Sequence, residues 1–287
     1  MRSDNWAVRI RKVIMPIFIY LLITFEVSFV GSFFVALYIQ MTGGYVNYEE
    51  YYEASEELLL SWSLPMTAVA ALITLPILVH MYNKDKQRLI IKQPDVSPVG
   101  YVAVAVLGMC ACFLLNALIV VSGLYELLSS GYADTATSIY TSPVWMQYLI
   151  TAVLVPIVEE LVFRGLVFRR MRTYLIPSLA VVISAILFGI YHMNLLQFIY
   201  ATCLGLLLAY VYEEFRTLIA PIVLHASANA ISIFISDNTS VAELLSGTDT
   251  RYIVSMVVSL VGTVLCAFLV YRFAHPKKGD NIHEGDN

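Results

Sequence analysis

Charged residues are scarce in this sequence: Asp, Glu, Lys and Arg make up only 13% of its 287 residues, whereas 59% are hydrophobic and the mean hydropathy is +0.76. A soluble fold of this size needs far more polar surface, so this class is excluded. The formal net charge of −4 hides an uneven distribution of charge between the loops, and because it predicts no nucleic-acid-binding patch, we expect no nucleic-acid partner. The composition predicts an integral, multi-pass membrane protein in a lipid bilayer.

Cysteine is also rare, and none of the four cysteines lies in a predicted loop. They are Cys110, Cys112, Cys203 and Cys266, and all fall within apolar stretches. Cys110 and Cys112 are too close together on a helix to bond easily. We therefore predict free, buried thiols in place of a disulfide framework.

Eight apolar stretches approach the length of about 20 residues that a membrane-spanning helix requires. They cover residues 13–40, 58–82, 99–122, 144–168, 176–193, 196–212, 217–236 and 251–273. The first follows a basic N-terminus but is too long for a signal peptide and lacks a small-residue cleavage site, so we interpret it as a retained span. The predicted fold class is an all-α polytopic membrane protein with about eight transmembrane helices.

The basic and acidic residues between these stretches alternate from one connection to the next. Lys and Arg gather at the N-terminus, in 83–98, in 169–172, at Arg216 and in the C-terminal tail, whereas 41–57, 123–143 and 237–250 are acidic. Because Lys and Arg prefer the cytoplasmic side, this pattern predicts that both termini are cytoplasmic. A model with seven spans would place one basic end outside, and is disfavoured. The short basic termini and the lack of large soluble segments favour a bacterial plasma membrane, with the endoplasmic reticulum as the alternative.

The sequence suggests three regions, because intramembrane charge is concentrated in one part of the chain. Residues 1–143 form an N-terminal region of three spans, 144–236 carry nearly all of the intramembrane polar groups, and 237–287 supply the last span and the tail. Ionisable groups within a bilayer are costly unless they are paired, and they commonly mark function. We therefore expect the chemistry to reside in 144–236.

The stretch at 144–168 contains Glu159, Glu160 and Arg164 in VPIVEELVFRG. Residues four apart share a helix face, so Glu160 and Arg164 are predicted to pair. Glu159 points about 100° away and has no such partner in its own helix, which leaves its carboxylate able to take a proton from water. An alternative interpretation is an interfacial cluster in which Arg164 extends toward lipid phosphates.

Two further polar sites lie in the stretches that follow. His225 and Asn229 are also four apart, and their imidazole and carboxamide can donate hydrogen bonds to a developing oxyanion or join helices together. His192 ends a short apolar stretch. A simple crossing would leave it near the outer surface, so we expect either that 176–193 begins deeper or that the turn after His192 lies inside the protein.

These three groups of residues resemble the ordered motifs of a known family. Glu-Glu-x-x-x-Arg at 159–164, Phe-x-x-x-His at 188–192 and His-x-x-x-Asn at 225–229 are similar to those of the CAAX protease and bacteriocin-processing (CPBP/Abi) family, which includes the type II CAAX prenyl endopeptidases. The resemblance covers about 144–236. It implies a helical intramembrane protease whose water-filled cavity usually opens toward the cytosol.

The resemblance also implies roles for individual residues. Glu159 and His192 would activate the attacking water, His225 and Asn229 would stabilise the oxyanion, and Glu160 and Arg164 would support the site. The substrate would be a peptide or a membrane-anchored protein: prenylated protein tails, bacteriocin leaders and secreted signalling peptides all remain open.

Other classes of function stay as alternatives. Every Asp lies in a loop or terminus, which disfavours an aspartyl intramembrane protease, and no recognisable serine nucleophile motif is present. We favour a hydrolase without a cofactor, with a zinc enzyme as the alternative in which Glu159, His192 and His225 would be the ligands. A transporter or a noncatalytic membrane regulator would use the same polar groups as a pathway or a binding pocket.

Overall fold

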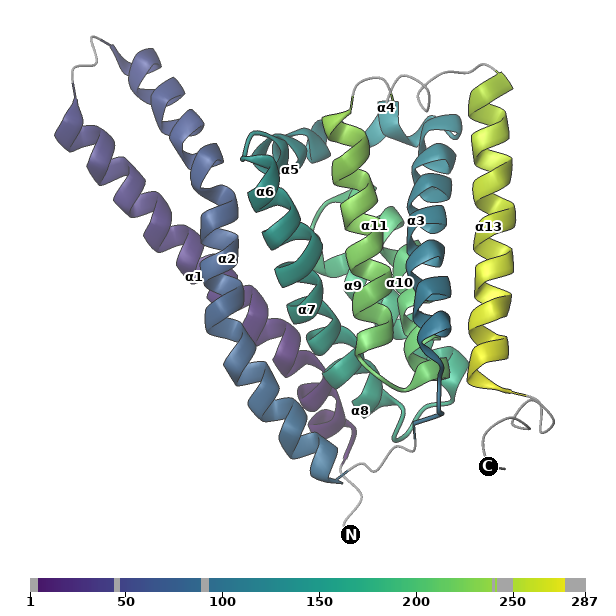
Figure 1. Ribbon diagram of the computed structural model, residues 1–287. Helices are drawn as coiled ribbons and strands as arrows, with labels where there is room; N and C mark the ends of the chain where they lie inside the picture. Colours follow the sequence, from purple (N-terminus) through teal and green to yellow (C-terminus); the bar gives the residue numbers. More distant parts are fainter. Residues whose placement is uncertain (1–4, 44–46, 89–92, 239–240, 242–249, 277–287) are drawn as a thin grey trace, which may run out of the picture.

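The computed structural model describes residues 5–43, 47–88, 93–238, 241 and 250–276, and this part of the chain is helical without strands (Figure 1). Six of its helices are long and apolar enough to cross a membrane. They are α1 (Trp6–Thr42), α2 (Tyr48–Arg88), α3 (Pro98–Val121), α10 (Leu195–Phe215), α11 (Ile219–Asp237) and α13 (Thr250–Ala274). The protein is thus an all-α polytopic membrane protein, as its composition predicts.

The other two predicted spans are helical but irregular. The first is a continuous stretch made of α6 (Val144–Met146), η1 (Gln147–Leu154), α7 (Val155–Glu160), η2 (Leu161–Phe168) and α8 (Arg169–Met171), in which η1 and η2 are π-helical. The second is α9 (Pro177–Tyr191), which has 15 residues. At 1.5 Å per residue α9 is about 22 Å long, shorter than the roughly 30 Å hydrocarbon core of a bilayer.

The segment expected to connect the third and fourth spans contains two short helices, α4 (Leu124–Leu128) and α5 (Ser130–Tyr140). Gly123 precedes α4 with a φ of 72°, a left-handed conformation that glycine adopts without strain. Figure 1 places α4 and α5 at the end of the bundle opposite the two chain termini. They therefore cover the end of the bundle at which α6 begins and α11 ends (Figure 1).

One buried core joins the first helix to the last. It includes Val13, Ile17 and Tyr20 of α1, Phe163 and Phe168 of η2, and Val270 of α13 among its members. Helix α3 packs against both α11 and α13, and α9 packs against α10. The half of α1 and α2 that lies farther from the chain termini splays away from the other helices (Figure 1).

All four cysteines are free thiols, but their burial differs from the expectation. Cys112 and Cys266 are buried and Cys110 is partly buried, whereas Cys203 is exposed on α10. The sequence could place Cys203 within an apolar helix, but could not determine which side of that helix faces other helices.

The contact between α3 and α11 depends on Gly108. A Cβ atom added there would overlap the Ser227 hydroxyl and the Leu224 carbonyl of α11. We expect Gly108→Ala to lower the free energy of unfolding by about 1–3 kcal/mol, because α11 must move away. Thermal unfolding in detergent would measure the change, with Gly43→Ala as the control, where a Cβ meets only ordinary contacts. An unaltered unfolding temperature in Gly108→Ala would contradict this packing.

Candidate active site

Glu159 and Glu160 lie at the end of α7, between the two π-helical segments. Pro156 near the start of α7 has no N–H to donate, which permits irregular hydrogen bonding in the preceding turns. π-Helical turns are rare and often occur at functional sites. Both carboxylates are buried within the protein, which argues against an interfacial cluster that extends toward lipid phosphates.

Glu160 and Arg164 form the expected pair. Arg164 Nη1 donates to Glu160 Oε1 at 3.0 Å, and both side chains are completely buried. Arg164 Nη2 donates to the Gly205 carbonyl of α10 at 3.0 Å, and its guanidinium lies 4.6 Å from the centre of the Phe188 ring. Arg164 thus joins η2 to α9 and α10, and its charge is balanced inside the protein.

His225 of α11 lies against both carboxylates. Its Nδ1 is 2.8 Å from Glu160 Oε1, and its Nε2 is 3.8 Å from Glu159 Oε2. Since Glu160 Oε1 also accepts from Arg164, it is an acceptor toward Nδ1 as well, so the Nδ1 proton donates to it. Nε2 is then free to face Glu159, at a distance longer than a hydrogen bond.

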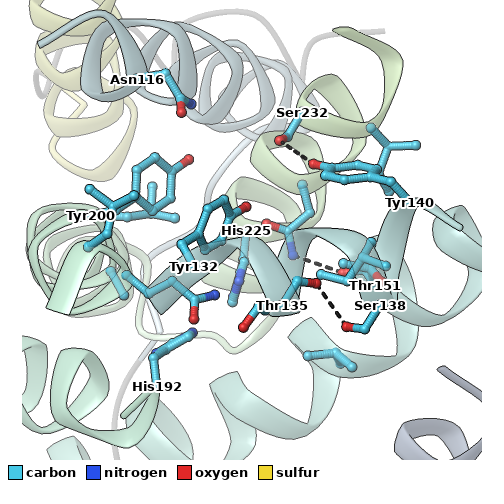
Figure 2. A pocket seen from close by; sticks show the side chains of 18 of the residues that line it. Asn116, Tyr132, Thr135, Ser138, Tyr140, Thr151, His192, Tyr200, His225 and Ser232 are labelled. Atoms are coloured by element: carbon cyan, nitrogen blue, oxygen red, sulfur yellow. Dashed lines mark hydrogen bonds between the residues drawn. The ribbon is translucent and has the colours of Figure 1, made fainter. Parts of the chain in front are cut away.

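Asn229 lies one turn beyond His225 on α11. Its Nδ2 donates to the Thr151 carbonyl of η1 at 2.8 Å, which fixes the amide relative to the helix that carries Glu159 (Figure 2). A carboxamide nitrogen has two protons, so this bond leaves the second available to another acceptor. Asn229 can therefore donate into the space that it lines.

His192 immediately follows α9, and the turn after it contacts α5. The short α9 ends at Tyr191, Met193 adopts a φ of 53°, and Asn194 caps α10 by accepting from the Gln197 N–H at 3.0 Å. The Asn194 side chain also donates to the Gly131 carbonyl of α5. The tight turn after His192 is thus tied to α5, and His192 lies beside the same space as the other polar residues.

The ring of His192 has a defined hydrogen-bonding state. Its Nδ1 is 2.9 Å from the Phe188 carbonyl, which can only accept, so Nδ1 carries the proton. In the neutral imidazole the lone pair is then on Nε2, which can accept a proton from water. The Phe188 ring packs edge-on against both His192 and His225, with centroid distances of 5.0 and 5.7 Å, and so fixes the two imidazoles relative to one another.

A cavity of about 430 Å³ connects these residues. Glu159, His192, His225 and Asn229 all line it, whereas Glu160 and Arg164 lie behind its wall. The remaining lining comes from α2, α3, α4, α5, η1, α7, α9, α10 and α11. Figure 2 shows His192, His225, Tyr132, Tyr140 and Tyr200 around the same space. Polar groups from three distant parts of the sequence thus meet at one space large enough for water and a stretch of peptide.

The cavity wall formed by α4 and α5 was not expected from the sequence. Tyr125, Tyr132, Thr135, Ser138 and Tyr140 line the cavity opposite or beside the polar cluster. The only signal was the abundance of Tyr, Ser and Thr in 123–143, which also suits an ordinary connection at a membrane surface. Thr151 and Gly205, whose carbonyls hold Asn229 and Arg164, carried no signal at all.

The zinc alternative can be compared with this geometry. Among the described residues no group of three His, Cys, Asp or Glu side chains is arranged to hold a metal ion. However, both imidazoles engage Nδ1 in a hydrogen bond and leave Nε2 without one, an arrangement that also suits metal ligands in general. The metal content of active protein therefore distinguishes the two chemistries.

Comparison with known proteins gives one match. Residues 141–231 match the family model described as "Type II CAAX prenyl endopeptidase Rce1-like". No curated protein and no solved structure matches the chain. The matched segment begins just before α6 and ends within α11, so it contains all six of the residues singled out from the sequence. This segment is therefore similar to the type II CAAX prenyl endopeptidases, in line with the resemblance of its motifs.

Proposed function

We propose that this protein is an intramembrane endopeptidase in which Glu159 activates water to hydrolyse a peptide bond. The observation that supports it best is the convergence of Glu159 from α7, His192 from the end of α9, and His225 and Asn229 from α11 on one cavity. The substrate is a peptide or a membrane-anchored protein that reaches this cavity.

In this mechanism the Glu159 carboxylate takes a proton from water, with His192 Nε2 as a second acceptor beside the cavity. The water oxygen attacks the carbonyl carbon of the scissile bond, and the carbonyl oxygen becomes an oxyanion. Asn229 donates its second amide proton to that oxyanion. The proton held by Glu159 then passes to the leaving nitrogen as the C–N bond breaks.

The hydrogen bond that His225 makes limits how it can stabilise the oxyanion. Because its Nδ1 proton is donated to Glu160, a neutral His225 has only an acceptor at Nε2. His225 therefore stabilises the oxyanion only in its protonated form, in which Nε2 also carries a proton. Glu160 and Arg164 act as positioning residues, since they hold His225 and line no part of the cavity.

The orientation of the protein also remains a proposal. If both termini are cytoplasmic, then α4 and α5 lie on the opposite side of the membrane (Figure 1). The cavity, which is lined by both, then lies toward the non-cytoplasmic side, in contrast to the cytosolic opening that the resemblance implies. A bacterial plasma membrane is the proposed location.

The test is a comparison of the peptides released from membranes that contain either the wild-type protein or Glu159→Gln, by mass spectrometry. New peptide termini that depend on the wild-type protein support the proposal, and identical sets of peptides contradict it. A zinc enzyme is recognised by stoichiometric zinc in active protein that is lost together with activity on chelation.

Asn229 provides a separate prediction. We expect Asn229→Ala to lower kcat by about 100-fold or more with little change in KM, because the amide donates to the oxyanion and not to the bound peptide. The matched control is Ser232→Ala, on the same helix and in the same cavity, where the hydroxyl contacts Tyr140 at 3.4 Å. Equal kcat values for the two variants would remove Asn229 from the mechanism.

A further inference from the structure

A second cavity, of about 840 Å³, is lined by the first two helices. Its lining on α1 extends from Glu26 to Tyr38, and its lining on α2 extends from Leu58 to Ile73. At 1.5 Å per residue these rows are about 18 Å and about 22 Å long, so the cavity is elongated along the two helices. We call it the α1–α2 groove.

The α1–α2 groove is separate from the candidate active site. Trp62 and Met66 of α2 line the groove, whereas Ser63 and Thr67, which lie about 100° further around the same helix, line the other cavity. No residue in the described part of the chain lines both. A ligand in the groove therefore lies on a different face of α2 from a peptide in the candidate active site.

The groove is open to the surroundings of the protein. Val30 and Phe34 of α1 and Trp62 and Val69 of α2 all line it, and all are exposed. It lies mainly in the half of α1 and α2 that splays away from the other helices (Figure 1). Two apolar rows on neighbouring helices form the kind of surface against which a third helix packs.

Exposed apolar side chains alone are what a helix presents to lipid, and Val258 and Val261 on α13 are exposed in the same way. The α1–α2 groove differs because it also contains a carboxylate. Glu26 is exposed, lines the groove and lies near the middle of the apolar stretch 13–40. It makes no hydrogen bond or ion pair with any residue that the structure describes. A carboxylate at this depth is costly unless a partner compensates it.

This chain has no suitable cation to offer from a second copy. Within its apolar stretches, Arg164 is the only Lys or Arg away from the ends, since Arg251 and Arg272 lie at the two ends of the last stretch. Arg164 is completely buried and paired with Glu160. A second copy docked on the groove would therefore bring no free Lys or Arg to the depth of Glu26.

We propose that the α1–α2 groove binds a transmembrane helix of another membrane protein, and that this helix carries a Lys or Arg near the middle of its span. The apolar rows contact the side chains of the bound helix, and Glu26 forms an ion pair with the cation. A lipid acyl chain can fill an apolar groove of this length, but it brings no cation to the centre of the bilayer. The proposal does not depend on the hydrolytic function.

The test uses full-length protein in which Trp6→Phe and Trp145→Phe leave Trp62 of the groove as the single tryptophan. In vesicles of phosphatidylcholine with brominated acyl chains, lipid in the groove quenches Trp62, and a peptide that displaces this lipid restores the fluorescence. The probes are single-span Leu-Ala peptides with identical ends and with Lys, Gln or Leu at the centre. We expect the Lys peptide to act at a concentration about tenfold lower than the others. Equal potency of the Lys and Gln peptides would overturn the ion pair.

Glu26→Gln tests the carboxylate in the same assay. This variant should lose the preference for the Lys peptide, and it should fold normally because Glu26 is exposed and makes no hydrogen bond or ion pair with a described residue. Thermal unfolding in detergent reports folding. A folded Glu26→Gln protein that still prefers the Lys peptide would refute the role of Glu26.

Val30→Phe tests the groove itself, because a larger side chain one turn from Glu26 fills space that the bound helix requires. We expect it to weaken the effect of the Lys peptide by about tenfold. Val258→Phe on the exposed face of α13 is the matched control and should have no effect. Equal effects of the two substitutions would place the peptide outside the groove.

Two other occupants give different results. Quenching of Trp62 that no peptide relieves would show that lipid keeps the groove, and would overturn the proposal. Energy transfer between differently labelled copies of the protein reports self-association. Self-association that Val30→Phe abolishes and Val258→Phe leaves intact would assign the groove to a second copy, and would also overturn the proposal.

Discussion

Glu159→Gln is expected to lower kcat for peptide hydrolysis by at least about 100-fold while the protein folds and inserts normally, because glutamine keeps the shape of the side chain but cannot accept a proton from water. Glu159 Oε2 lies 3.8 Å from His225 Nε2, beyond hydrogen-bonding distance, so the substitution breaks no hydrogen bond between them. The measurements are the rate of peptide release and the unfolding temperature in detergent.

A control for this variant lies next to it in the sequence. Glu160 does not line the cavity, but its Oε1 accepts from both Arg164 and His225. Glu160→Gln should therefore lower both stability and activity, whereas Glu159→Gln lowers activity alone. Wild-type turnover in folded Glu159→Gln protein would refute the assignment of Glu159 as the general base.

Arg164→Met should cause the largest loss of stability of any substitution considered, about 3–5 kcal/mol, because it leaves the buried Glu160 carboxylate without its cation. Both side chains are inaccessible, so water cannot replace the lost partner. The hydrogen bond to the Gly205 carbonyl and the contact with the Phe188 ring are lost as well. Chemical or thermal unfolding in detergent would measure the effect.

The double variant Glu160→Gln/Arg164→Met distinguishes loss of charge balance from loss of packing. Removal of both charges should restore most of the stability lost in Arg164→Met, since neutral groups of similar volume commonly replace a buried pair without penalty. Activity should stay low, because His225 Nδ1 no longer donates to a carboxylate. If the double variant is no more stable than Arg164→Met, packing rather than charge accounts for the loss.

The local relations within single helices were predictable, and the contacts between helices were not. The spacing of Glu160 and Arg164 predicted their pair, because residues four apart share one helix face. No spacing could predict that His225, 65 residues after Glu160, donates to the same oxygen. The sequence likewise could not place Thr151 beside Asn229, since a backbone carbonyl has no residue-specific signal.

The irregular parts of the fold also could not be predicted from the sequence. The π-helical segments on either side of α7 have the apolar composition of an ordinary membrane span, so hydropathy does not reveal them. The abundance of Tyr, Ser and Thr in 123–143 predicted a connection, but α4 and α5 lie over the cavity with contacts to α2 and α11. Such contacts join residues that are far apart in the chain.

The sequence by itself determined that this protein lies in a bilayer, because apolar length and scarce charge leave no other way to solvate the chain. It also determined which polar side chains must be compensated, because an unpaired charge in hydrocarbon is costly. Only the tertiary structure decided that Glu159, His192, His225 and Asn229 share one cavity and that α5 forms its neutral wall. The reason is that helix packing sets the rotation and depth of each helix, and both depend on partners distant in sequence.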